Sequence, residues 1–269
     1  MDFLIIIIIA LLPSTVWLLF FLRKDVHPEP KSMILKVLFL GALVAPIAAF
    51  DGTGFQELLL SFNLSPESVV FFLLYWFIGV GMVEEILKYL VVRFLVLSHH
   101  EFDEPIDAML YMIISGLGFA ALENILVIFS QTILNQSLGE TLSLIVYRFL
   151  TAVFLHALCS ALIGYFLALS ICDTKHQFKL ISTGLGLGII FHALYDIAMI
   201  KIYDNLIEIG GKVMILDLNV FIISTVLFLA ILIGLAFFVI RGFRKLKKMQ
   251  SVCLPDFVLT KSKRAGKIE

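Results

Sequence analysis

Long runs of apolar residues, separated by short polar stretches, follow one another along almost the whole chain. A helix needs about 20 such residues to cross the roughly 30 Å hydrocarbon layer of a bilayer, and most of the runs reach that length. The predicted spanning helices are residues 3–22, 33–50, 69–97, 106–133, 143–171, 179–201 and 216–240. The pattern therefore predicts an all-α fold, a polytopic membrane helix bundle of about seven transmembrane helices.

Composition supports this prediction. The chain is 61% hydrophobic and its mean hydropathy is +1.04, whereas a soluble domain is apolar over only about half of its residues. The first apolar run begins after Asp2 and has no basic segment before it. We therefore interpret it as the first membrane helix rather than as a cleaved signal peptide.

The charges of the connecting segments alternate along the chain. Lys and Arg gather in segments 23–31 and 172–179 and after residue 241, and they are absent from segments 51–68 and 134–142. By the positive-inside rule this predicts an N-terminus outside and a C-terminus inside. It also divides the chain into a transmembrane bundle, residues 1–242, and a basic cytoplasmic tail, residues 243–269. Segment 51–68 is compatible both with a short interfacial helix and with a simple external loop.

Ionisable side chains interrupt these apolar runs well away from the predicted helix ends. They are Glu84, Glu85, Glu123, His156, His192 and Asp196. Each charge near the bilayer centre costs at least about 2.5–3.5 kcal/mol, so isolated charges are unfavourable there. The predicted third to sixth helices each carry at least one of these groups. The sequence therefore predicts that they face one another around a buried polar cavity.

The pair Glu84-Glu85 is followed by Lys88. Adjacent helical residues project about 100° apart, so both carboxylates can border one cavity. Lys88 lies on the same face as Glu84 and can pair with it. A purely structural ion pair would explain Glu84 and Lys88 but would leave Glu85 without a role.

Two further motifs carry polar groups at similar depth. Small residues from Gly116 to Ala121 allow close helix approach just before Glu123 and Asn124. Asn124 could orient a substrate carbonyl or hold a carboxylate, or it could simply bond a neighbouring helix. His192 and Asp196 are four residues apart and share a helix face, so the aspartate can hold the imidazole in one tautomer.

Taken in order, these motifs resemble the PrsW family of bacterial membrane proteases, which is related to the wider Abi/CAAX-processing glutamic protease clan. The matching motifs are Glu84-Glu85-x-x-Lys88, Asp103-Glu104-Pro105-x-Asp107, Gly118-Phe119-Ala120 with Glu123-Asn124, His156, and His192-x-x-x-Asp196. The resemblance implies cleavage of single-pass membrane proteins such as anti-sigma factors in the bacterial cytoplasmic membrane. It also implies a catalytic set, namely Glu84, Glu85, Glu123, His156 and His192, with Lys88, Asn124 and Asp196 supporting it.

Our hypothesis is an intramembrane endopeptidase in which Glu84 or Glu85 takes a proton from water as general base. His156 and His192, with Asn124, then stabilise the developing oxyanion or protonate the leaving amine, and Glu123 tunes the set. We expect the lipid bilayer and a membrane-protein substrate as partners, and no nucleic acid.

Two questions stay open at this level. The preferred version of the hypothesis needs no cofactor, but a divalent metal such as zinc could lie between the same groups, with His156, His192 and Glu123 as candidate ligands. The alternatives from other classes are a proton- or ion-coupled transporter and a non-enzymatic membrane scaffold or immunity protein. The inverted repeats common in transporters are not found in this sequence.

Overall fold

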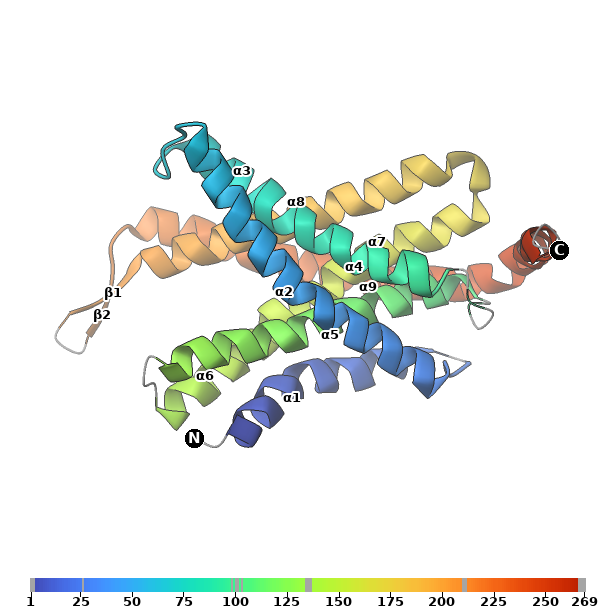
Figure 1. Cartoon of the computed structure of the whole chain (residues 1–269), viewed down its shortest axis with the longest axis horizontal. Coiled ribbons are helices and arrows are strands. Elements are labelled where there is room, and N and C mark those ends of the chain that lie inside the picture. The colour runs from blue at the N-terminus through green and yellow to red at the C-terminus, as the bar shows by residue number, and fades with distance from the viewer. Residues whose placement is uncertain are drawn as a thin grey trace.

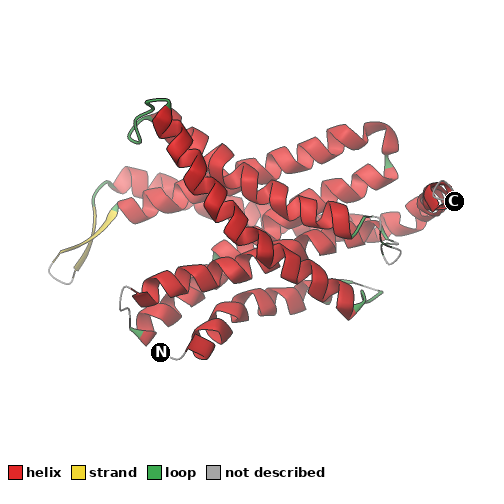
Figure 2. Ribbon diagram, in the orientation of Figure 1, coloured by secondary structure: helices red, strands yellow, loops and turns green. Residues whose placement is uncertain are grey.

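The chain folds into an almost wholly helical bundle with one small hairpin of two strands (Figure 2). The structure is a computed structural model, and it describes residues 3–25, 27–97, 99, 102, 104–133, 137–209 and 212–265. The predicted fold class, an all-α polytopic membrane bundle, is confirmed.

The helices follow the predicted apolar runs closely, but runs 33–50 and 216–240 are extended and runs 69–97 and 143–171 are divided. The elements in chain order are α1 (Phe3–Leu22), α2 (Lys31–Ser61), α3 (Val69–Leu74), the π-helix η1 (Tyr75–Met82), α4 (Val83–Leu95), α5 (Pro105–Ile133), α6 (Leu138–Leu150), α7 (Ala152–Cys172), the 3-10 turn η2 (Thr174–His176), α8 (Gln177–Asp204), β1 (Leu206–Ile209), β2 (Lys212–Ile215) and α9 (Leu218–Ala265).

Six helical segments of the described chain are long and apolar enough to cross a membrane. They are Lys31–Ser61, Val69–Leu95, Pro105–Ser130, Leu138–Cys172, Thr174–Asp204 and Leu218–Met249. The predicted first span is also an apolar helix, described as a shorter stretch over Ile7–Leu22. Helix α9 runs from Leu218 to Ala265, so no helix end marks the predicted boundary between the bundle and the tail at residue 242. The cytoplasmic tail and the orientation of the termini stay predictions.

Three local features differ from the expected helices. Helix α2 continues to Ser61, so residues 51–61 form neither a separate interfacial helix nor a loop, and Asn63 follows with a left-handed φ of 57°. The predicted helix 143–171 is two helices, because Thr151 leaves helical geometry with φ −119° and ψ −88°. The predicted loop between α8 and α9 contains the antiparallel hairpin β1–β2, which pairs Leu206 with Ile215.

Helices α5 and α7 form the centre of the bundle, and α2 crosses over α5 in Figure 1. Glycines permit this close packing. A Cβ on Gly118 would collide with the carbonyl oxygen of Leu38 on α2, and one on Gly116 would collide with Ser160 on α7. The predicted close approach at the small residues of α5 is therefore confirmed, and it brings the polar residues of α5 and α7 together.

Candidate active site

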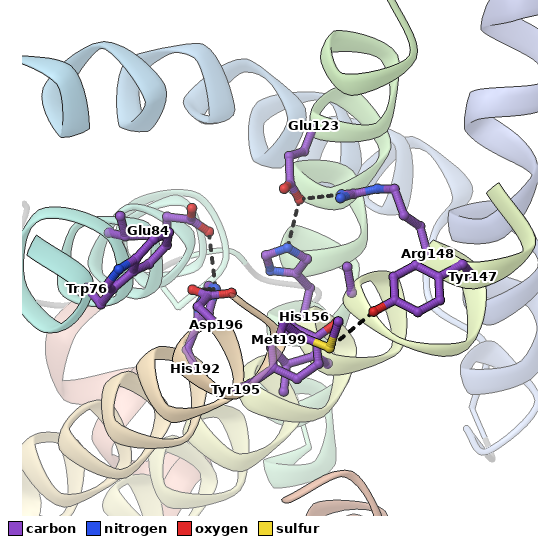
Figure 3. A pocket seen from close by; sticks show the side chains of 13 residues that line it. Trp76, Glu84, Glu123, Tyr147, Arg148, His156, His192, Tyr195, Asp196 and Met199 are labelled. Carbon is purple, nitrogen blue, oxygen red and sulfur yellow. Dashed lines mark hydrogen bonds and ion pairs between the residues drawn. The ribbon is translucent and has the colours of Figure 1, made fainter. Parts of the chain in front are cut away.

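The ionisable residues singled out in the sequence converge in the middle of the bundle around one cavity of about 300 Å³ (Figure 3). Its lining comes from η1, α4, α5, α6, α7 and α8, and consists of Trp76, Val80, Glu84, Glu123, Tyr147, Arg148, Ala152, Leu155, His156, His192, Tyr195, Asp196 and Met199. The prediction of a shared polar cavity between the third to sixth predicted helices is confirmed in its geometry, while the catalytic roles stay predictions.

Lys88 is the centre of the charge network on α4. Its Nζ is completely buried and lies 2.8 Å from Glu85 Oε1 and 3.2 Å from Glu84 Oε2. The predicted Glu84–Lys88 pair is therefore present. The expectation that both carboxylates border the cavity is wrong for Glu85, which is fully buried behind Lys88 and His192. Of the two glutamates on α4, only Glu84 contributes to the lining.

Glu85 instead orients His192. Its Oε1 lies 2.7 Å from His192 Nδ1, and because an ionised carboxylate only accepts, Nδ1 carries the proton and donates. When His192 is neutral, its lone pair is therefore on Nε2, which lies 3.5 Å from Asp196 Oδ2 and 3.7 Å from Glu84 Oε2. The predicted proximity of His192 and Asp196 is confirmed, but the residue that fixes the tautomer is Glu85.

His156 has the opposite arrangement. Its Nδ1 lies 2.9 Å from Lys88 Nζ, and an ammonium group only donates, so Nδ1 accepts. Nε2 then carries the proton and donates to Glu123 Oε2 at 2.9 Å. The two imidazoles lie side by side with ring centroids 5.1 Å apart. His156 thus presents an N–H to the cavity, whereas His192 presents a lone pair.

Arg148 is a site residue that the sequence reasoning missed, although a basic residue inside an apolar run was a usable signal. Its Nη2 lies 3.0 Å from Glu123 Oε2, and its Nε donates to Asn124 Oδ1 (Figure 3 shows the Glu123 contact). Asn124 is fully buried and donates through Nδ2 to the carbonyl oxygen of Ala10 on α1 at 3.2 Å. Of the two roles left open for Asn124, bonding a neighbouring helix is therefore confirmed.

The donors around His192 fit a divalent metal ion. Glu84, His156 and His192 each offer a donor atom, and these atoms lie within 4.8 Å of one another. Asp196 Oδ2 is buried and has no hydrogen-bond partner among the described residues. In tetrahedral zinc sites the bonds of about 2.0–2.2 Å place ligand atoms roughly 3.3–3.6 Å apart. The separations of 3.5 and 3.7 Å around His192 Nε2 are close to that range.

A bundle of spanning helices that encloses carboxylates and imidazoles able to hold a divalent ion is the arrangement expected of an intramembrane metalloprotease. Comparison with known families agrees. The family described as "PrsW family intramembrane metalloprotease" matches residues 29–237, and the chain belongs to this family. The resemblance predicted from the motifs is confirmed.

Individual relatives give the same result. The chain is 30% identical to Protease PrsW of Bacillus subtilis over 181 residues, which cover 66% of this chain and 74% of that protein. It is 29% identical to Protease PrsW of Geobacillus kaustophilus over 178 residues, which cover 66% of this chain and 71% of that protein. No solved structure matches the chain. Membership of this family identifies the chain as a membrane protease, in preference to the transporter and scaffold alternatives.

Proposed function

We propose that this chain is a metal-dependent endopeptidase that cuts single-pass membrane proteins, with anti-sigma factors as the first candidates. The observation that carries the proposal is the convergence of His192 Nε2, Glu84 and Asp196 on one side of a cavity inside the bundle. The description of the family as metalloproteases supports the metal-dependent version of the mechanism over the version without a cofactor.

His192, Glu84 and Asp196 would hold the ion. The hydrogen bond from His192 Nδ1 to Glu85 directs the lone pair of Nε2 toward the two carboxylates, as expected of a metal-binding histidine. The Nε2 proton of His156 makes this histidine a poorer ligand while Lys88 donates to its Nδ1. A bound divalent ion would supply a water with a pKa lowered toward about 7 and a polarised peptide carbonyl.

The other cavity residues have the groups that peptide hydrolysis needs. The Glu123 carboxylate is about one-third exposed and can accept a proton from the attacking water and pass it to the leaving amine. The Nε2–H of His156 can change its hydrogen-bond acceptor from Glu123 to the oxygen of the tetrahedral intermediate. Arg148 holds Glu123 in place and adds positive charge beside that oxygen. We therefore assign the general base to Glu123 and the orientation of His192 to Glu85.

The substrate must unwind before it is cut. A transmembrane helix satisfies its carbonyl groups internally, and the lipid offers no other partner for them. The cavity supplies polar groups at membrane depth, so an extended stretch of substrate can exchange its helical hydrogen bonds for contacts with the enzyme. This requirement favours single-pass proteins, whose one helix is not held by neighbours.

The test is co-expression with a single-pass anti-sigma factor, read out as cleavage on a gel. The wild-type chain should cut it, and Glu84→Gln, His192→Ala and Glu123→Gln should not. Glu57→Gln, on an exposed position of α2, is the matched control and should cut normally. Thermal unfolding of each purified variant identifies loss of fold.

Metal analysis of the same proteins tests the proposed ligands directly. The wild-type chain should contain about one divalent ion per molecule, and Asp196→Asn and His192→Ala should lose it, whereas Glu57→Gln should keep it. Cleavage that survives Glu84→Gln and His192→Ala would overturn the proposed site. A full metal content in Asp196→Asn and His192→Ala would overturn the ligand assignment.

A further inference from the structure

The cavity is lined by two chemically different sets of residues. The catalytic groups Glu84, His156, His192 and Asp196 form a polar floor. A second, less polar set of lining residues, here called the mouth, consists of Trp76 and Val80 on η1, Tyr147 on α6 and Met199 on α8. Trp76 and Val80 precede Glu84 by eight and four residues, and Met199 follows Asp196 by three. An apolar mouth above a polar floor suits a ligand that arrives from hydrocarbon.

Helix α6 is anchored on the side away from α8. The indole Nε1 of Trp17 on α1 donates to the carbonyl oxygen of Phe149 at 2.9 Å, and the two rings stack with centroids 5.4 Å apart. The main packing partners of α6 are α7 and α1. These contacts hold α6 against α1, so they leave its Tyr147 face toward the cavity mouth.

Helix α8 is anchored on the opposite side, to the segment that carries η1. Lys201 Nζ lies 5.2 Å from the ring centroid of Phe72 on α3, and Gly81 on η1 fits closely against the backbone of Ile189 on α8. Between α6 and α8, Tyr147 Oη lies 3.1 Å from Met199 Sδ at the mouth (Figure 3), and Tyr195 on α8 shares a hydrogen bond with Thr151 at the C-terminal end of α6. A thioether is a weak acceptor, so this bridge costs little to open.

The residues beside the bridge face the lipid. On α6, the side chains next to Tyr147 are apolar and strongly exposed, with Val146 at 58% and Leu150 at 56%. Tyr147 itself is 45% exposed. Helices α6 and α7 together form a segment, Leu138–Cys172, that is long and apolar enough to span a bilayer, so apolar side chains exposed on it contact acyl chains. The Tyr147–Met199 bridge therefore separates the cavity from lipid rather than from bulk water.

We propose that the gap between α6 and α8, closed by Tyr147 and Met199, is the lateral portal through which the transmembrane segment of a substrate protein enters the cavity. The inference rests on the proposed function and adds the entry route and the residues that control it. The two anchors hold α6 and α8 on opposite sides of the gap, so the gap opens by movement of the Tyr147 and Met199 side chains, while His192 stays held by Glu85 and Glu123 by Arg148. The apolar mouth accommodates the side chains of the segment while its backbone reaches the polar floor.

The test locks the portal. The variant Tyr147→Cys/Met199→Cys is treated in detergent with a short bifunctional thiol reagent. A reagent is needed because the native contact joins the ends of two long side chains, so cysteines on the same backbones are too far apart for a direct disulfide. Two probes are compared: the single-pass anti-sigma factor, and a short soluble peptide that spans the bond cut in it. Cleavage is expressed as the ratio of crosslinked to untreated enzyme, and each single-cysteine variant with the same reagent is the control.

Crosslinking should slow cleavage of the anchored protein by about tenfold or more, equivalent to about 1.4 kcal/mol of barrier, and should leave the peptide nearly unaffected. An equal effect on both probes, or no effect on either, would overturn the portal. If the double-cysteine variant is inactive, Tyr147→Ala is the second test. Its rate of cleavage of the anchored protein, divided by its rate with the peptide, should exceed the wild-type ratio. An unchanged ratio refutes the portal. A failure of the proposed function is distinguishable, because it appears as cleavage of both probes by Glu84→Gln.

Discussion

Replacing Lys88 by methionine tests the charge network at the centre of the site. Lys88 Nζ is completely buried and contacts Glu84, Glu85 and His156. Methionine fills nearly the same volume but leaves the Glu85 carboxylate, which is also fully buried, without a counter-charge. Removing one partner of a buried ion pair costs about 3–5 kcal/mol, because the remaining charge stays desolvated. We expect Lys88→Met to lower the stability of the fold by about this amount.

Thermal unfolding in detergent, followed by tryptophan fluorescence, is the assay. At about 2–4 °C per kcal/mol for a chain of this size, Lys88→Met should lower Tm by roughly 6–20 °C. Lys36→Met is the matched control, since Lys36 is exposed on α2, and it should change stability by less than about 0.5 kcal/mol.

A second substitution separates the charge effect from lost packing. Glu85→Gln removes the buried charge and keeps an acceptor for His192 Nδ1. The double variant Lys88→Met/Glu85→Gln should therefore be more stable than Lys88→Met alone, with a coupling of about 1–3 kcal/mol. A Tm for Lys88→Met equal to that of Lys36→Met, or strictly additive effects in the double variant, would refute the view that Lys88 neutralises Glu85.

Two further substitutions test the helix packing that positions the site, both by thermal unfolding. Gly118→Ala places a methyl group against the backbone of α2 and should destabilise the bundle by about 1–3 kcal/mol, whereas Gly54→Ala, with open space around it, should stabilise α2 by about 0.5–1 kcal/mol. Equal effects at the two glycines would contradict the close crossing. Asn124→Ala removes the acceptor of Arg148 Nε and should cost about 1–3 kcal/mol. Asn219→Ala, at an exposed position, should be neutral, and an equally neutral Asn124→Ala would show that the bridge to Arg148 adds no stability.

The helices and their polar content could be predicted from the sequence because both follow from a transfer cost. An apolar run of about 20 residues has few alternatives to a spanning helix, and a charge within it has to face other polar groups. Depth is also readable, since each helical residue advances about 1.5 Å. That is why Glu84, Glu123, His156 and His192 could be assigned to one level before their helices were placed.

The places where the structure departs from the predicted helices are marked only weakly in the sequence. The break at Thr151 replaces one helical residue in a continuous apolar run, and hydropathy averaged over a window is insensitive to one residue. The strands β1 and β2 are two short stretches rich in β-branched residues, and in the sequence they flank Gly210 and Gly211, which is a pattern typical of a hairpin. Helix α2 extends to Ser61 through Asp51, Gly52 and Gly54, polar and glycine residues that hydropathy treats as the end of a span.

The direction in which each side chain projects from its helix could not be predicted, and this direction decides which side chains line the cavity. Glu84 and Glu85 are adjacent carboxylates, yet a rotation of about 100° places one in the cavity lining and makes the other a buried partner of His192. The direction that faces the cavity depends on how α4 packs against α7 and α8, which involves residues more than sixty positions away in the chain. Sequence spacing within one helix cannot contain that information.

The same reasoning explains how two histidines acquire opposite roles. His156 and His192 come from different helices and are equally buried, so the sequence treats them alike. In the folded chain the Nδ1 atom of His192 meets the carboxylate of Glu85, and the Nδ1 atom of His156 meets the ammonium group of Lys88. The carboxylate can only accept a hydrogen bond and the ammonium group can only donate one. The Nε2 atom of a neutral His192 therefore has a free lone pair, whereas the Nε2 atom of His156 carries a proton. A single Glu85–Lys88 ion pair thus gives the two imidazoles different hydrogen-bonding character, and the proposed mechanism uses this difference by assigning the ion to His192 and the hydrogen-bond donor to His156.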